Sequence, residues 1–160
     1  MPRFARIALV VLSLFVSSRM EILVAQDQDV PHPALPAGAG AIDAAAPKTF
    51  TKTGSGLEYR ILRAGEGAKP KASNTVKVHY HGWLDNGKVF DSSYERREPI
   101  EFPLNGVIPG WTEGMQQVGQ GGMIELSIPS ELGYGARGTP GGPIPPNARL
   151  HFLVELLNVR

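Results

Sequence analysis

The chain has 160 residues, which is enough for one domain of ordinary size with its own hydrophobic core. Its 19 glycines and 14 prolines favour strands joined by irregular loops over an all-helical fold. The formal net charge is only +1 and there is no basic block, so nothing indicates nucleic-acid binding. The absence of cysteine excludes disulfides, thiolate metal ligands and cysteine nucleophiles.

Residues 1–25 have the pattern of a secretory signal peptide. A short basic start precedes the apolar run 7–16, which is too short to span a bilayer. Small residues at Ser18 and Ala25 offer two cleavage positions. The sequence therefore predicts export, to a periplasm or the extracellular space, with no stable membrane span after cleavage. The alternatives are an N-terminal extension without defined structure and a translation start at Met20.

Residues 26–48 are rich in proline and alanine and contain few large apolar side chains. Such a composition buries too little surface to fold by itself, so we expect a linker here. The folded domain is predicted to occupy residues 49–160.

A strand, a tight turn and a returning strand are predicted over residues 76–93. Side chains of the first strand alternate between two faces, with Val76, Val78, Tyr80 and Leu84 on one and Lys77, His79, His81 and Trp83 on the other. This period of two is typical of a half-buried strand. The residues Asp85-Asn86-Gly87 tolerate the positive φ of a tight turn. The returning strand then brings Phe90 and Asp91 close to Tyr80.

The other predicted elements are four strands, one helix and two loops. Alternating patterns predict strands at 57–62, 100–102, 123–128 and 150–159. The segment 107–118 is the one good helix candidate, because Pro109 suits a first turn and apolar residues recur at helical spacing. Residues 94–98 are expected to form a charged loop, and 133–146 a long Gly- and Pro-rich loop. The elements together predict an α+β domain in which an antiparallel sheet packs one face against the helix.

A group of apolar and aromatic side chains contains Asp91 as its one charge: Tyr80, Phe90, Val107, Ile108, Trp111, Tyr134, Ile144 and Phe152. A hydrophobic core and a binding pocket both account for such a group. The pocket is favoured by the position of Val107, Tyr134 and Ile144 on loops or at the ends of elements, where core residues are less expected.

Three histidines form a second candidate group. His79 and His81 share a strand face, and His151 is predicted on the outer face of the last strand. They suggest either a metal site or an exposed sheet face with scattered polar residues. The exposed face is favoured, because no carboxylate partner is evident and the apolar group lies on the other face.

Five segments resemble the FKBP-type peptidyl-prolyl cis-trans isomerases, in the order and at the spacing of that family. They are VHYHG at 78–82, FDSS at 90–93, VIPGWTEG at 107–114, YGARG at 134–138 and IPPNARLHFLVELL at 144–157. The resemblance covers residues 49–160, and a signal peptide ahead of such a domain resembles the exported bacterial branch. It implies a five-stranded antiparallel half-barrel wrapped around one short helix, with a proline-binding pocket between them.

The resemblance also implies roles for individual residues. The catalytic residues would be Tyr80, Asp91, Trp111 and Tyr134. The substrate-binding residues would be Phe90, Arg96, Ile100, Val107, Ile108, Ile144 and Phe152. Within this set, Trp111 would form the pocket floor and Arg96 would pair with Asp91. The family implies no cofactor and no metal.

The function implied by the resemblance is acceleration of X-Pro bond rotation, which assists the folding of exported proteins. The expected partners are proline-containing peptides and unfolded exported proteins. Macrolide inhibitors are a further class of ligand, and departures at the pocket rim, such as Ile100 and Thr139, leave their affinity open. The alternative is a non-catalytic peptide-binding or chaperone module that uses the same pocket.

Overall fold

The computed structural model describes residues 29–160, so the signal-peptide prediction and the first residues of the predicted linker lie outside the described part. The strands are β1 (Thr51–Lys52), β2 (Glu58–Arg63), β3 (Thr75–Leu84), β4 (Val89–Ser92), β5 (Ile100–Pro103), β6 (Met123–Ile128) and β7 (Leu150–Val159). The helices are α1 (Ser93–Arg96) and α2 (Pro109–Met115), with 3₁₀ turns η1 (Leu104–Gly106), η2 (Ser130–Leu132) and η3 (Gly135–Arg137). Within residues 29–160, no helix has the length and apolar character needed to cross a membrane.

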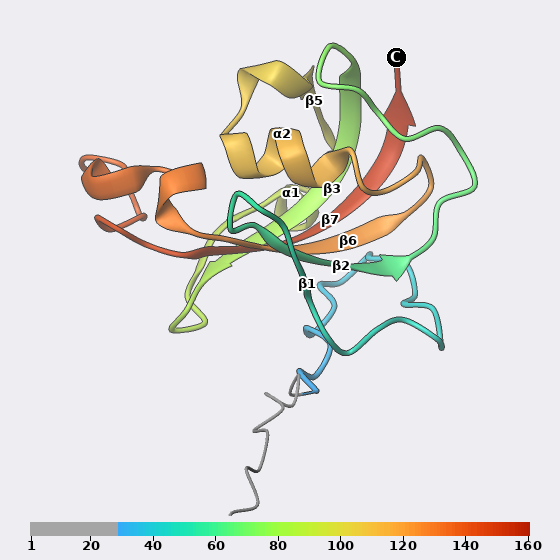
Figure 1. Ribbon diagram of the computed structural model, residues 1–160, viewed down its shortest axis with the longest axis horizontal. Helices are drawn as coiled ribbons and strands as arrows, with labels where there is room; N and C mark the ends of the chain where they lie inside the picture. The colour runs from blue at the N-terminus through green and yellow to red at the C-terminus, as the bar shows by residue number, and fades with distance from the viewer. Residues whose placement is uncertain (1–28) are drawn as a thin grey trace, which may run out of the picture.

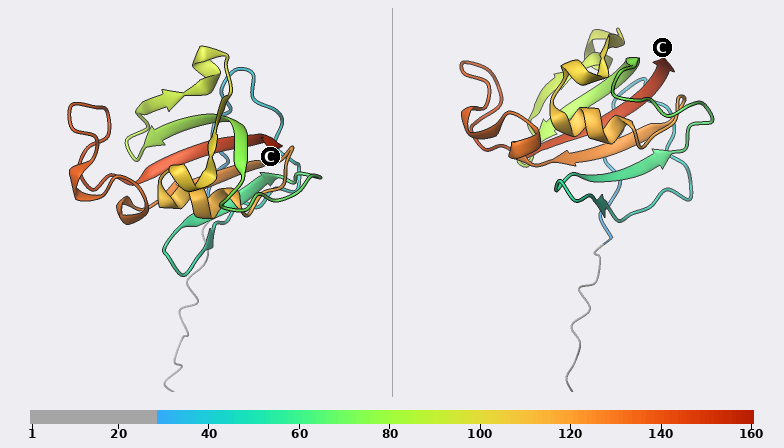
Figure 2. Two further views of the ribbon diagram at one scale, coloured as in Figure 1. Left: turned by 90° about the horizontal axis from the view of Figure 1, so that it is seen from above. Right: turned by 45° about the horizontal axis from the view of Figure 1, so that its top comes forward.

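The strands form one antiparallel sheet that curves around α2 (Figures 1 and 2). Their order is β1-β2-β6-β7-β3-β4, and β5 also pairs with β3. β4 and β5 pair with different parts of the same strand, so together they act as one strand that α1 interrupts. With β1 only two residues long, the five predicted strands correspond to β2, β6, β7, β3 and the interrupted strand. The FKBP-like fold predicted from the sequence is therefore confirmed.

The inner face of the sheet and α2 enclose the main core. The alternation predicted for β3 is confirmed, because every second side chain from Val76 to Leu84 is buried. Pro109 lies in the first turn of α2, as predicted, but the helix spans only Pro109–Met115 and is shorter at both ends than the predicted segment 107–118. The helix can lie close to β6 because Gly114 faces Leu126, where an added Cβ would come within 2.6 Å of the leucine side chain.

The outer face of the sheet is covered by residues 29–48, which we call the N-terminal strap (blue to cyan in Figures 1 and 2). The strap has no helix or strand, but it packs along the sheet, unlike the linker expected from its composition. Its main anchor is Arg60 of β2, which is 1% exposed. The Arg60 guanidinium donates to Glu125 at 2.7 Å and to the backbone carbonyls of Val30, Pro31 and Lys48 at 2.6–2.9 Å. A buried cation needs such acceptors, and the strap supplies most of them.

Residues 94–98, predicted to be a charged loop, begin with the single helical turn α1. The difference arises because Ser93 and Tyr94 are buried, which the charged neighbours of Tyr94 in the sequence conceal. α1 ends at Arg96, and the C-cap residue Arg97, whose φ of 55° is left-handed, turns the chain toward β5.

We expect the strap to stabilise the domain measurably. A chain of residues 49–160 lacks three carbonyl acceptors of the Arg60 guanidinium. Its free energy of unfolding should therefore be lower than that of residues 29–160 by about 1–3 kcal/mol. Urea denaturation of the two chains measures the difference. As a control, Arg60→Met should cost much less stability in the short chain than in the long one. Equal free energies of unfolding for the two chains would show that the strap contributes nothing to the stability of the domain.

Candidate functional site

A pocket of about 740 Å³ lies on the inner face of the sheet, next to α2. Its lining residues come from four strands, α2 and two loops: Tyr80, Phe90, Asp91, Ile100, Phe102, Gly106, Val107, Ile108, Trp111, Tyr134, Thr139, Pro143, Ile144 and Phe152. All predicted site residues except Arg96 line this pocket, and Arg96 hydrogen-bonds to two of them. The structure therefore brings the predicted residues together, although they are spread over more than seventy positions of the chain.

The floor of the pocket is a cluster of aromatic rings around Trp111. The indole, on the first turn of α2, is 5% exposed and packs edge-on against Tyr80 at 5.6 Å and against Phe152 at 5.2 Å between ring centroids. Phe102 of β5 packs on it from a third direction at 5.5 Å. Edge-to-face pairs of this kind contribute about 0.5–1.5 kcal/mol each beyond the area they bury. The floor is consequently apolar and held in one arrangement.

Gly82 makes room for one wall of the pocket. It lies on the buried face of β3, directly across the sheet from Phe152 on one side and Asp91 on the other. A Cβ at this position would come within 2.8 Å of the rings of both Phe90 and Phe152. Because Gly82 has none, these two rings meet edge-to-face at 5.3 Å. Any larger residue here would push the wall apart.

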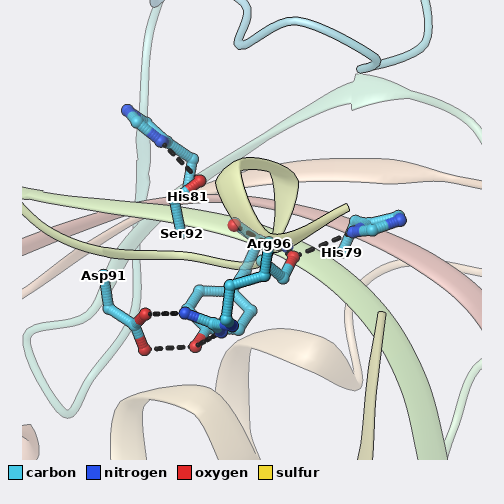
Figure 3. A network of polar contacts seen from close by, with 7 residues as sticks. His79, His81, Asp91, Ser92 and Arg96 are labelled. Atoms are coloured by element: carbon cyan, nitrogen blue, oxygen red, sulfur yellow. Dashed lines mark hydrogen bonds and ion pairs between the residues drawn. The ribbon is translucent and has the colours of Figure 1, made fainter. Parts of the chain in front are cut away.

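The polar side of the pocket consists of Tyr80, Asp91 and Arg96 (Figure 3). The Tyr80 hydroxyl donates to Oδ2 of Asp91, and Nη1 of Arg96 donates to Oδ1 of the same carboxylate. Nη2 of Arg96 donates to the Tyr80 oxygen at 2.8 Å, which closes a three-membered ring of hydrogen bonds. Asp91 is held beside Tyr80 because it pairs with Gly82 in the β3–β4 ladder.

The protonation states of these three groups follow from their contacts. Burial, followed by the hydrogen bond to Asp91, raises the pKa of Tyr80 above its ordinary value, so the phenol stays neutral. Burial alone would raise the pKa of Asp91, but hydrogen bonds from Tyr80 and Arg96 outweigh it and hold that pKa below its usual range. The hydrogen bonds that Arg96 makes to Asp91 and to Tyr80 raise its own pKa. At neutral pH the group is therefore an ion pair that fixes a neutral phenol.

The long loop forms part of the rim of the pocket. Thr139 closes a turn in this loop, because its N–H donates to the Ile144 carbonyl at 2.9 Å and its hydroxyl oxygen accepts from the Ile144 N–H at 3.0 Å. Gly138, with a φ of +57°, passes so close to this turn that a Cβ would lie 2.3 Å from the Ile144 carbonyl oxygen. Ile144 is thereby buried in the pocket, whereas Tyr134 is 43% exposed at the rim.

Four lining residues were absent from the predicted substrate-binding set: Phe102, Gly106, Thr139 and Pro143, although Thr139 was expected at the pocket rim. The alternation of β5 could have identified Phe102, because it shares a strand face with the predicted Ile100. Thr139 and Pro143 belong to the irregular loop, where no periodic pattern indicates which side chains turn inward. Sequence reasoning therefore found the regular part of the wall and missed part of the rim.

The three histidines of the outer face are held apart. His79 contacts the Ser93 hydroxyl at 2.9 Å, and His81 contacts the Ser92 hydroxyl at 3.1 Å (Figure 3). His151 contacts Asp85 at 2.7 Å, and Trp83 stands between it and His81, stacked on the His151 ring. In the described part of the chain no three His, Asp or Glu side chains are placed to hold a metal ion. The metal alternative raised by the sequence is therefore not supported.

A second hollow of about 730 Å³ lies between the strap and the outer face. Its charged side chains already have partners: Arg149 contacts Glu58 at 3.4 Å and the Ser127 hydroxyl at 2.9 Å, and Glu125 accepts from Arg60 at 2.7 Å. The expectation of an exposed outer face is thus replaced by one that the strap partly covers. The inner pocket, with its aromatic floor and single polar side, is the candidate site.

Comparison with known proteins places the chain in a family. The FKBP-type peptidyl-prolyl cis-trans isomerase family matches residues 66–157. FkpA of Escherichia coli K12, an FKBP-type peptidyl-prolyl cis-trans isomerase, is 53% identical over 113 residues, which are 71% of this chain and 41% of FkpA. The chain thus spans less than half the length of this relative.

Solved structures agree with the sequence comparison. The crystal structure of FkpA from Escherichia coli superposes with a TM-score of 0.67 and 53% identity, over 69% of this chain and 51% of that one. A peptidyl-prolyl cis-trans isomerase from Pseudomonas syringae superposes with a TM-score of 0.64 and 39% identity, over 69% and 80% of the two chains. The chain belongs to the FKBP-type peptidyl-prolyl cis-trans isomerase family.

Proposed function

We propose that this protein catalyses cis–trans rotation about X-Pro bonds of peptide substrates in the inner pocket. The observation that carries the proposal is the pairing of an apolar aromatic floor with a single polar side, formed by Tyr80, Asp91 and Arg96. Membership of an isomerase family supports the same activity. The reaction needs neither a nucleophile nor a cofactor, since no covalent bond is broken.

The chemistry requires only that the twisted amide be held better than the planar one. The barrier to rotation, about 18–20 kcal/mol, arises because twisting breaks the amide resonance. The twisted amide is less dipolar than the planar amide, so an apolar, water-poor pocket favours it relative to water. Fixed hydrogen-bonding groups add to this differential binding. A thousandfold acceleration needs a difference of only about 4 kcal/mol.

In this proposal each part of the pocket has one task. The proline ring of the substrate lies on Trp111, between the walls formed by Phe90 and Phe152. Tyr134, exposed at the rim, offers its hydroxyl to a substrate carbonyl. The ion pair of Asp91 and Arg96 holds the polar side in place while the amide turns.

We expect Asp91→Ala to lower kcat/KM for a proline-containing peptide by about 10- to 100-fold, or ~1.4–2.7 kcal/mol. The reason is that Tyr80 and Arg96 both lose the carboxylate that orients them. Asp85→Ala is the matched control, because this acid contacts His151 on the outer face and should leave the activity unchanged. An NMR exchange assay or a coupled peptide assay on the full chain measures both variants.

The same assay separates catalysis from simple binding. Peptide binding by the wild-type protein without any acceleration would favour the non-catalytic module and contradict the proposal. Acceleration that survives Asp91→Ala undiminished would leave the activity standing but remove this carboxylate from the site.

The pKa of Asp91 predicts a particular pH dependence. Because the folded-state pKa is lowered, the carboxylate keeps its contacts as the pH falls past the ordinary aspartate value of 3.8 and loses them only below it. In the wild type, kcat/KM should therefore not yet fall as the pH is lowered to that value. Arg96→Ala removes one of the groups that lower the pKa of Asp91, so kcat/KM of this variant should begin to fall at a higher pH than in the wild type. The same onset of the fall in both proteins would contradict the ion-pair role of Arg96.

We also propose that the protein is exported and assists the folding of proline-containing chains outside the cytoplasm, with residues 1–25 as its signal peptide. The support is the basic and apolar pattern of these residues. Mass spectrometry of the protein purified from expressing cells should give a mature N-terminus at Arg19 or Gln26. An intact N-terminus in the exported fraction would contradict the proposed cleavage.

A macrolide titration of the same sample tests whether the rim formed by Ile100 and Thr139 still admits such an inhibitor.

A further inference from the structure

The helix α1 carries Arg96 to the site, but it cannot be stable by itself. It is a single turn of four residues, and its N-cap residue Ser92 makes no capping hydrogen bond with its side chain. Fixing one turn of helix costs more conformational freedom than its few hydrogen bonds return. The side chain of Arg96 is about half exposed, so packing around it does not fix its position either. Something else must hold α1 in place.

The first anchor of α1 is Ser93, which ties it to β3. The Ser93 hydroxyl is fully buried, accepts from the Tyr80 N–H at 2.8 Å and contacts the Tyr80 carbonyl oxygen at 3.2 Å. This contact fixes the backbone of the residue that carries the phenol of the site. The Ser93 contact lies at the first residue of α1, however, and does not fix the position of the later residues of the turn.

The second anchor is Tyr94, which reaches across the outer face of the sheet to β7. Its ring stacks on His79 at 4.7 Å, and its hydroxyl donates to Oε1 of Glu155 at 2.6 Å. Glu155 is directly opposite His79 in the β3–β7 ladder, which explains why one side chain can touch both residues. Tyr94 thus fastens the middle of α1 to two neighbouring strands.

Glu155 is itself held rigidly. It is 7% exposed, its Oε2 accepts from Arg63 of β2 at 2.6 Å, and its Oε1 also accepts from the Gly40 N–H of the strap at 2.8 Å. Burial alone would raise the pKa of Glu155, but hydrogen bonds from Tyr94, Arg63 and Gly40 outweigh it and lower that pKa. The carboxylate is therefore ionised at neutral pH and is a fixed acceptor for the Tyr94 hydroxyl.

We propose that Tyr94 and Glu155 are positioning residues of the site, which act through α1 to keep Arg96 in contact with Asp91 and Tyr80. Tyr94 and Arg96 are two residues apart on one helical turn, so a turn that shifts at Tyr94 also shifts the guanidinium. The site on the inner face is thereby supported from the outer face of the same sheet. The effect of these residues on catalysis rests on the proposed function, whereas their effect on Asp91 does not.

The test is the titration of the Asp91 carboxyl by carbon NMR in the full chain. The groups that face Asp91 are the Tyr80 hydroxyl, the Arg96 guanidinium and the Ser92 N–H. Tyr94→Phe keeps the ring on His79 and removes only the hydroxyl, so the variant should fold. We expect the titration midpoint of Asp91 to rise in Tyr94→Phe because Arg96 is held less firmly. Tyr59→Phe, a half-buried tyrosine of β2, is the matched control and should not move the midpoint.

A double-mutant cycle with Arg96 identifies the route of the effect. If Tyr94 acts through Arg96, Tyr94→Phe should raise the Asp91 midpoint in the wild-type background and change it no further in Arg96→Ala. Glu155→Gln should act like Tyr94→Phe. An unchanged midpoint in Tyr94→Phe, or an equal rise in both backgrounds, would overturn the proposal.

Activity measurements then complete the experiment. kcat/KM should fall about two- to tenfold in Tyr94→Phe and not at all in Tyr59→Phe, which is the range expected for one net hydrogen bond. A two- to tenfold loss of kcat/KM in Tyr94→Phe together with an unchanged titration midpoint of Asp91 would again overturn the positioning role. A wild-type protein without isomerase activity would refute the proposed function, while the Asp91 titration would still decide the role of Tyr94.

Discussion

The pairing of β3 is the constraint on which the pocket depends. One edge of β3 pairs with β7 from Val76 opposite Val159 to Leu84 opposite Leu150, and the other edge pairs with both β4 and β5. Because side chains alternate along a strand, this one register decides which residues face α2. A slip of one residue would turn Tyr80 outward and bring its histidine neighbours into the core. The aromatic floor, the Asp91 contact and the room left by Gly82 all follow from the same register, so the site is a property of the sheet more than of any single loop.

The inner face of the sheet carries mainly apolar contacts, and the outer face carries most of the charged ones. Among residues 29–160, the inner face holds the aromatic pocket and the ion pair of Asp91 with Arg96 at its edge. The outer face holds the buried pair of Arg60 with Glu125 and the partly buried pair of Arg63 with Glu155, and the strap supplies several of their other hydrogen-bonding partners. Buried charges are tolerated only when such partners are complete, and losing one partner costs far more than the pair contributes. The strap is therefore best understood as part of the folded domain, although its composition resembles that of a linker.

Much of this architecture could be predicted from the sequence because strands and helices produce a regular spacing of apolar residues along the chain. The strands, the start of the helix at Pro109 and most of the pocket wall follow from alternation or helical spacing. The strap and α1 escaped prediction for a different reason. Both are held by long-range contacts, mainly with Arg60 in one case and with Tyr80 and Glu155 in the other, and these contacts leave no repeating pattern in the segments they hold. Phe102 lies between these cases, since its alternation was visible but only its contact with Trp111 shows that it belongs to the pocket.

The interruption of the strand by α1 explains how Arg96 can reach Asp91 at all. Were β4 and β5 one continuous strand, these residues would be five positions apart, roughly 16 Å along the strand and on opposite faces of the sheet. No arginine side chain spans that distance around a strand edge. The single turn of α1 shortens the path and brings the guanidinium back over the carboxylate that precedes it. A regular sheet would be easier to build here, but it could not assemble this polar side. The local irregularity, and the buried tyrosine and glutamate that hold it, are thus what convert an apolar cavity in a curved sheet into a pocket with a fixed charge at its edge.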